Sequence, residues 1–180
     1  MTKNNVIAQI GEPILRKKTT EVKINSILSI KIRNIINKLI VTMREFNGAG
    51  LAANQIFYNL RICVLELENN KRYRHIPNIP LTILINPKIK ILNKKSTFDS
   101  YEGCLSVPNL RGIVKRYTKI QVDYFDHNRN FHSKEISRFS AVVYQHEIDH
   151  LDGLLFTDKI VDNKSLVTNE NYKKYHEENI

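Results

Sequence analysis

Apolar residues follow a helical spacing over residues 26–46, where they recur at steps of three and four positions. Such spacing places them along one face of an α-helix. Ser26 can cap the amino end of this helix, and Gly48 follows its last turn. The pattern therefore predicts a long amphipathic helix near the amino terminus, with a buried face made of Leu28, Ile32, Ile35, Ile36, Leu39, Met43 and Phe46.

A second run with helical spacing covers residues 137–151, where Phe139, Val142, Val143 and Leu151 recur. Gly153 follows this run and suits the left-handed backbone conformation in which many helices end. We expect a second helix here, largely buried in the core.

The region between the two predicted helices has the character of β-structure, because short runs of residues alternate or cluster their apolar side chains. Turn-forming residues at 126–130 separate two such runs, so residues 119–136 are predicted to form a β-hairpin. The order of helix, antiparallel strands and helix predicts an α+β fold. The predicted strands cover residues 61–67, 81–86, 88–92 and 119–125.

Length and composition are those of one globular domain. The 180 residues are 42% hydrophobic and 26% charged, which is ordinary for a chain that buries a single core. We expect residues 1–157 to form that domain. Residues 158–180 are polar with weak periodicity, so they are expected to be a short polar tail, either a short helix or disordered.

Charge and cysteine content narrow the functional classes only slightly. The formal net charge of +10 can attract a ribosome surface or nucleic acid, but a composition rich in lysine, asparagine and isoleucine, of the kind that an AT-rich genome imposes, is the favoured explanation. No specific DNA binding is expected. Cys63 and Cys104 are too few for a disulfide framework. Without an apolar span or a signal peptide, we expect a cytoplasmic protein. A monomer is the default expectation.

A metal-binding pattern lies inside the second predicted helix, in the segment Gln145-His-Glu-Ile-Asp-His150. Residues four apart in a helix are rotated by about 40° and rise about 6 Å, so His146 and His150 can share one ion. Glu147 is placed to reach a water on that ion rather than the ion itself. A helix with two surface histidines is the competing interpretation.

Two histidines leave a catalytic ion short of one protein ligand. Cys104 is the strongest candidate, because the segment Glu102-Gly-Cys-Leu-Ser106 has a glycine that permits a tight turn, and a cation stabilises a thiolate. A buried cysteine can also be a small apolar core residue. Four more side chains are candidate ligands: Asp149, Asp152, His132 and Glu135.

A third segment, Gly48-Ala-Gly-Leu-Ala-Ala-Asn-Gln55, is rich in small residues. Such residues let a backbone pass close to a ligand, and the Gln55 amide can stabilise a negatively charged oxygen. A loop that packs a helix closely against a strand would show the same composition.

These three segments, in this order and spacing, resemble the three signature motifs of the peptide deformylases. Gly11-Glu-Pro-Ile-Leu-Arg16 resembles the usual opening of that family, so the likeness covers about residues 7–157. It implies a metal-dependent amide hydrolase that removes the N-formyl group from the initiator methionine of nascent polypeptides and releases formate. It also implies antiparallel β-sheets packed around a buried metal-binding helix.

The resemblance assigns a role to individual residues. Cys104, His146 and His150 match the metal ligands, and Glu147 matches the general acid and base. The Gln55 amide and the Leu105 backbone N–H would stabilise the oxyanion. The residues that match the substrate site are Arg111 for the peptide and Ala49, Gly50, Phe139, Val142 and Val143 for the methionine side chain.

The resemblance further implies one divalent metal ion, ferrous iron in the native protein, with zinc, nickel or cobalt as substitutes. The implied partners are formyl-methionyl nascent peptides. Two features depart from the family: Ala49 stands where many relatives have a larger aliphatic residue, and the tail is shorter than the long helix of many bacterial members. The subclass is therefore left open.

Two further functions compete with this interpretation. A metallopeptidase would share the His-Glu-x-x-His pattern but take its third ligand from farther along the chain. An RNA-binding module with a structural metal would need a fourth ligand, for which Cys63 is the spare cysteine. The downstream ligand candidates for a metallopeptidase are Glu170, His176, Glu177 and Glu178.

Overall fold

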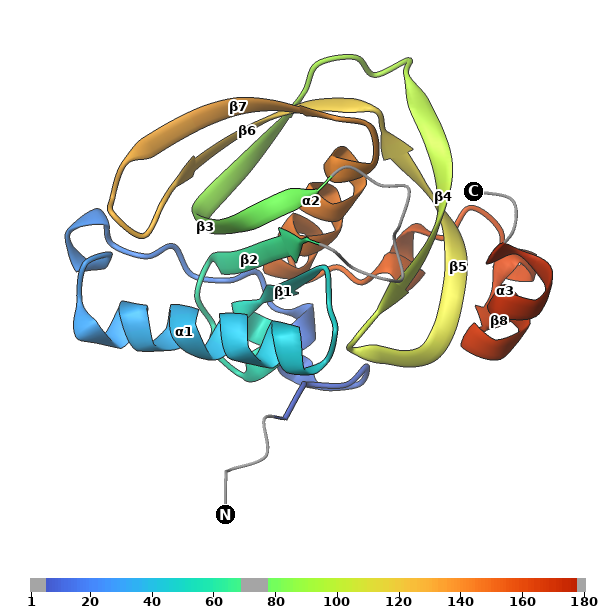
Figure 1. Cartoon of the computed structure of the whole chain (residues 1–180), viewed down its shortest axis with the longest axis horizontal. Helices are drawn as coiled ribbons and strands as arrows, with labels where there is room; N and C mark the ends of the chain where they lie inside the picture. The colour runs from blue at the N-terminus through green and yellow to red at the C-terminus, as the bar shows by residue number, and fades with distance from the viewer. Residues whose placement is uncertain (1–5, 69–77, 178–180) are drawn as a thin grey trace.

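Two antiparallel sheets flank helix α2 in the computed structural model, which describes residues 6–68 and 78–177 (Figure 1). This α2 contacts strands of both sheets. The predicted α+β fold with antiparallel sheets is confirmed. The five-stranded sheet has the order β1-β2-β3-β6-β7, and its strands are β1 (Gly50–Ala52), β2 (Ile62–Leu67), β3 (Ile79–Ile91), β6 (Lys119–Phe125) and β7 (Phe131–Ser137). The three-stranded sheet has the order β4-β5-β8, with β4 (Thr97–Cys104), β5 (Val107–Tyr117) and β8 (Val167–Thr168).

The first predicted helix is present as α1 (Ile30–Glu45), but it begins later than the apolar pattern predicts. The Ser29 hydroxyl caps it by accepting a hydrogen bond from the Ile32 N–H at 3.4 Å. Ser26, the predicted cap, instead ends a 3₁₀ turn, Ile24–Ser26. The turn buries Ile27 in the core, so the chain changes direction before the helix starts.

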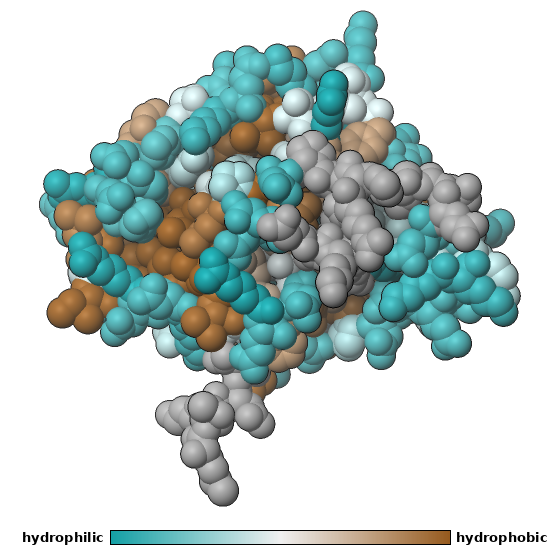
Figure 2. Space-filling model, in the orientation of Figure 1, coloured by the Kyte–Doolittle hydropathy of each residue, from teal (hydrophilic) through white to brown (hydrophobic). Residues whose placement is uncertain are grey.

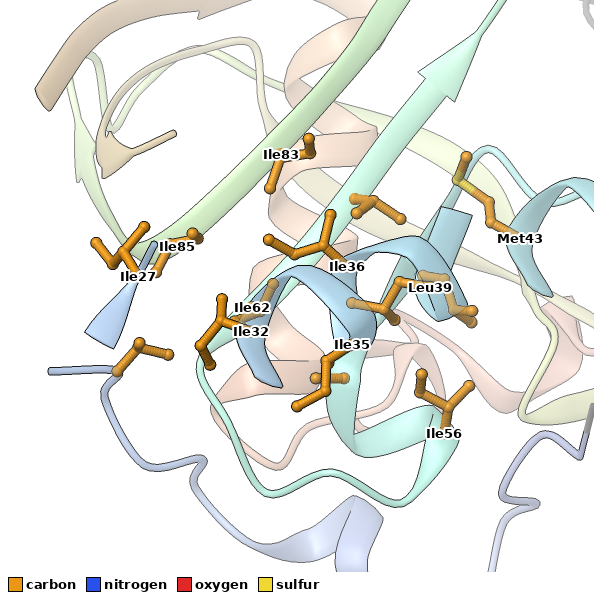
Figure 3. Close-up of a cluster of buried hydrophobic side chains, with 14 of the residues drawn as sticks. Ile27, Ile32, Ile35, Ile36, Leu39, Met43, Ile56, Ile62, Ile83 and Ile85 are labelled. Atoms are coloured by element: carbon orange, nitrogen blue, oxygen red, sulfur yellow. The ribbon is translucent and has the colours of Figure 1, made fainter. Parts of the chain in front are cut away.

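The apolar face of α1 packs on β2 and β3 to form a core cluster (Figure 3). Each fully buried isoleucine or leucine contributes roughly 1.5 to 3 kcal/mol by leaving water. Leu28 and Phe46 belong to the predicted buried face but are about two-fifths exposed, and they lie just outside the two ends of α1. In Figure 2, hydrophobic side chains show at the surface above α1, whereas the surface at the right is mainly hydrophilic. The α1 residues of the cluster are Ile32, Ile35, Ile36, Leu39 and Met43.

The central strand β3 joins two segments that the sequence pattern predicts as separate strands. A register shift between Ile85 and Lys88 marks an irregularity at the junction, where Asn86 has a φ of +54°. Asparagine tolerates this left-handed conformation better than most residues. The Asn86 side chain also bonds the backbone N–H and C=O of Val22, each at 2.8 Å, which ties the amino-terminal segment to the sheet. The predicted hairpin is present as β6 and β7.

Helix α2 (Arg138–Leu151) ends at a junction that several segments hold in place. Gly153 has a φ of +78°, as expected for the residue after the helix. Buried Arg61 donates from Nη1 to the Leu151 carbonyl at 3.3 Å and to Asp152 Oδ1 at 2.8 Å. The carboxyl end of α2 is therefore fixed to the start of β2.

The polar tail comes after α2 in the chain and contains regular secondary structure. Strand β8 pairs with β5, and the short helix α3 (Asn169–Tyr175) follows it. Two 3₁₀ turns, Phe156–Lys159 and Asn163–Ser165, lie upstream. The domain boundary after residue 157 stays a prediction. No helix in the described ranges combines the length and apolar character needed to cross a membrane.

We predict that Gly153→Ala destabilises the protein more than Gly11→Ala. Both glycines have positive φ angles, of +78° and +105°, and an alanine in such a conformation costs roughly 1 to 2 kcal/mol. An added Cβ at Gly153 would also lie 2.9 Å from the Arg16 backbone, whereas one at Gly11 meets no atom within 4 Å. Urea unfolding measures both changes, and equal losses would contradict the close contact.

Candidate metal centre and active site

Three potential metal ligands converge where the second sheet meets α2. The ligand atoms of Cys104, His146 and His150 all lie within 4.8 Å of one another. Cys104 Sγ is 3.2 Å from His150 Nε2, which is 3.3 Å from His146 Nε2. Within residues 6–68 and 78–177, no other group of histidine, cysteine or acidic side chains converges in this way.

Local structure explains why these donors meet. The two histidines lie one turn apart on α2, so their rings project from the same side of the helix. Cys104 is the last residue of β4, where the pairing with β5 changes register after Gly103. This change of register lets the Ser106 backbone N–H approach Cys104 Sγ to 3.4 Å.

Glu102 orients the His146 ring. Its Oε2 accepts a hydrogen bond from His146 Nδ1 at 2.8 Å, which leaves Nε2 for the metal site. Arg116 binds Glu102 through Nε and Nη2 at 2.6 and 2.9 Å. Burial opposes ionisation of Glu102, but the bonds from Arg116 and His146 outweigh it and lower its pKa to about 2. The carboxylate is therefore ionised.

The electrostatics of the site also favour a thiolate at Cys104. Burial alone would raise the pKa of this thiol, but the adjacent His150 and His146 lower it well below its usual value. Thiolate sulfur and imidazole nitrogen together form a donor set that binds zinc, iron, cobalt or nickel. The residues present fit a divalent ion of this kind.

Glu147 faces the same site from α2. Burial raises the pKa of its carboxyl group to about 7, while the two neighbouring histidines act in the opposite direction. Among the described residues, Glu147 Oε2 has no hydrogen-bond partner. A carboxyl group of this kind can accept or donate a proton near neutral pH.

The backbone at Gly50 leaves room for Glu147. An added Cβ at this glycine would lie 2.6 Å from Cγ, Cδ and Oε1 of Glu147, which is too close for any real contact. Strand β1 thus approaches α2 to a distance that only glycine permits. The small residues of this segment serve close packing against a functional side chain.

A cavity of about 390 Å³ opens beside the group formed by Cys104, His146 and His150. The Gln55 side chain reaches it with Nε2 at 3.1 Å from Ser106 Oγ and 3.6 Å from Cys104 Sγ, while its Oε1 accepts from the Ala52 N–H at 2.8 Å. His150 is buried and does not line the cavity. The remaining predicted site residues all line it: Ala49, Gly50, Gln55, Cys104, Leu105, Arg111, Phe139, Val142, Val143, His146 and Glu147.

Residues that sequence patterns did not point to also line the cavity, among them Tyr101 and Asn169. Asn169 begins α3 in the polar tail, where weak periodicity gave no signal. Tyr101 lies on β4, whose alternation of buried and exposed residues is too irregular to indicate a strand.

The four side chains that could have replaced Cys104 as a metal ligand pair with charged groups elsewhere. Asp149 binds Arg116 and Lys159, and Asp152 binds Arg61. The remaining two lie on the β6–β7 hairpin, where His132 pairs with Asp126 and Glu135 with Lys119.

Neither Cys63 nor the described part of the polar tail supplies a ligand to the group of Cys104, His146 and His150. Cys63 is buried in the core cluster of β2 and α2 and is not part of that group. The tail residues Glu170, His176 and Glu177 are not part of it either. Glu178 lies outside the described residues.

Comparison with known proteins agrees with this geometry. Residues 5–166 match the family model of the polypeptide deformylases. The chain belongs to the polypeptide deformylase family. Peptide deformylase 2 of Nostoc sp. is 38% identical over 168 residues, which are 93% of this chain and 92% of that protein. The peptide deformylase of Leptospira biflexa is 38% identical over 165 residues, 91% of this chain and 92% of that one.

Solved structures of deformylases share the fold. The class I type b peptide deformylase from Acinetobacter baumannii with bound Met-Ala-Ser has a TM-score of 0.82 at 32% identity, over 89% of this chain and all of that one. The Thermotoga maritima peptide deformylase has a TM-score of 0.74 at 31% identity, over 87% and 97% of the two chains. The predicted family and activity are confirmed: this deformylase removes the N-formyl group from nascent polypeptides.

We predict that Gly50→Ala destabilises the deformylase and reduces formate release, because the new methyl group displaces Glu147. Overpacking of this kind costs roughly 1 to 3 kcal/mol. The same change in a Glu147→Ala background should cost little, since the three atoms in conflict are then absent. Urea unfolding of the four proteins measures the coupling. Equal costs in both backgrounds would contradict the contact.

Proposed function

We propose that Cys104, His146 and His150 hold one divalent metal ion, ferrous iron in the native protein, and that Glu147 moves the protons of amide hydrolysis. The convergence of one sulfur and two ring nitrogens beside a buried carboxyl group is the observation that carries this proposal. Three protein donors leave a position free for water or substrate, as in catalytic rather than structural sites.

The metal supplies Lewis acidity, which activates water and polarises a carbonyl oxygen. Glu147 accepts a proton from the attacking water as its oxygen forms a bond to the formyl carbon. The bond between that carbon and the methionine nitrogen then breaks, and Glu147 donates the proton to the departing amine. Formate and a free methionine amino group result. Oε2 of Glu147 has no hydrogen-bond partner in the part of the chain that the structure describes, which supports this role.

Two hydrogen-bond donors stabilise the negatively charged oxygen of the tetrahedral intermediate, the Gln55 amide and the Leu105 backbone N–H. Gln55 Oε1 accepts a hydrogen bond from the Ala52 N–H. The other end of the amide, its NH₂ group, therefore faces Cys104 and Ser106. Loss of one such donor typically costs about 3 kcal/mol of transition-state stabilisation.

The methionine side chain occupies the apolar part of the cavity, near Ala49, Gly50, Phe139, Val142 and Val143. An extended peptide can continue from there by pairing with a strand edge. Both β1 and β4 are terminal strands of their sheets, and residues of both line the cavity. The Acinetobacter baumannii structure holds Met-Ala-Ser, and a product peptide of this kind suits the present cavity.

The setting of the reaction follows from the substrate. We infer a monomer that acts in the cytoplasm on formyl-methionyl chains as they leave the ribosome. The net charge of +10 favours approach to a ribosome surface, which is rich in phosphate.

We predict that Glu147→Ala lowers formate release from formyl-Met-Ala-Ser by roughly 100-fold to 10,000-fold, the usual contribution of a general acid and base. The variant keeps its metal, because Glu147 is not a ligand. The proteins are purified without oxygen, and metal content is measured beside turnover. Glu135→Ala is the control, since this carboxylate is exposed on β7. Wild-type activity that survives complete removal of metal by a chelator would contradict the mechanism.

A further inference from the structure

The Arg111 side chain is held between β4 and the tail helix α3. On one side lies Gly103 of β4. Its backbone is so close that an added Cβ would lie 3.3 Å from Arg111 Cγ and 3.6 Å from Arg111 Cζ. On the other side, Cζ lies 4.5 Å from the centre of the Tyr172 ring, the geometry of a cation–π contact. Arg111 Nε donates to Asn169 Oδ1 at 3.1 Å. The guanidinium group is therefore clamped.

Arg111 differs from the other buried arginines because no carboxylate among the described residues pairs with it. Arg61 pairs with Asp152, and Arg116 pairs with Glu102 and Asp149. Within the described residues, no acidic group lies within ion-pair distance of Arg111, and Nε is its one side-chain nitrogen with a hydrogen-bond partner. A buried cation without an anionic partner is costly. Arg111 lines the cavity, so its terminal NH₂ groups are available to a ligand.

The tail segment is anchored beside Arg111 by several contacts. Strand β8 pairs with β5 at Arg111 itself, opposite Val167. The Thr168 hydroxyl caps α3 by accepting from the Asn171 N–H at 3.2 Å. The Tyr172 ring meets the Tyr101 ring edge-on, with centroids 5.2 Å apart. The position of α3 is thus set by the same strands that form the cavity wall.

We propose that α3 is a positioning element for substrate binding, in which Asn169 and Tyr172 hold Arg111 so that its terminal NH₂ groups bind a backbone carbonyl of the peptide beyond methionine. This inference rests on the proposed function. An arginine that is already ordered loses less side-chain entropy when it binds, so the clamp strengthens peptide binding without contact between α3 and the reacting atoms.

Steady-state kinetics with two substrates test this role. The probes are formyl-Met-Ala-Ser amide, which has no terminal carboxylate, and formyl-methionine, which has no peptide beyond methionine. Tyr172→Leu and Asn169→Ala should each raise KM for the peptide by about fivefold, the effect of losing a partly desolvated contact to the cation. The kcat for the peptide should not change, and neither should kcat or KM for formyl-methionine.

Matched variants separate positioning from folding. Tyr172→Phe keeps the ring and should restore the peptide KM. Tyr175→Leu alters an exposed tyrosine of the same helix and should leave kcat and KM unchanged for both substrates. In an Arg111→Ala background, Tyr172→Leu should add no further effect, because the group that it holds is gone. Calorimetric affinity for Met-Ala-Ser amide should fall by the same factor as KM rises.

Several results would overturn the inference. These are an unchanged peptide KM, an equal rise for both substrates, or a full additional loss in the Arg111→Ala background. If thermal unfolding shows that Tyr172→Leu is not folded, Asn169→Ala with and without Arg111→Ala applies the same test. A wild-type protein that releases no formate from either substrate overturns the proposed function itself, whereas an active wild type with unmoved constants overturns the clamp alone.

Discussion

The buried ion network around Glu102 is the constraint on which the site depends, because it holds the second sheet against α2. Arg116 on β5 binds Glu102 on β4 and Asp149 on α2, and Glu102 in turn binds the His146 ring. This arrangement brings the end of β4 to the helix and places Cys104 beside the histidines. Removal of one member would leave an uncompensated buried charge, so the network acts as a unit.

Close backbone approach is the second requirement of the site. Gly50 lets β1 pass within contact distance of Glu147, and Gln55 follows on a short 3₁₀ turn that directs its amide toward Cys104. The cost of this packing is a carboxyl group buried with one oxygen unpaired among the described residues. The same burial gives Glu147 a pKa near neutrality. A locally unfavourable environment thus produces the property that proton transfer needs.

Periodicity predicted the elements that bury one face, and spacing indicated that His146 and His150 project from the same side of one helix. The core face of α1 and the pairing of β6 with β7 follow directly from alternation of apolar residues. The start of α1 did not, because Leu28 fits the helical spacing but lies before the helix, next to a 3₁₀ turn and the buried Ile27. The approach of Cys104 to α2 depends on contacts between segments far apart in the chain. Its sequence setting made it a candidate ligand, but the spacing of residues could not show that it meets the histidines. The contact of Tyr172 with Arg111 is of the same kind, and no local pattern marks it.

The most direct test of the account is the metal content of Cys104→Ala and Cys63→Ala proteins, with the ligands of the bound ion identified by X-ray absorption. The account predicts one ion per chain, bound by one sulfur and two nitrogen donors, in the wild type and in Cys63→Ala, and no stably bound ion in Cys104→Ala. Retention of the ion by Cys104→Ala together with its loss from Cys63→Ala would contradict the assignment of the site.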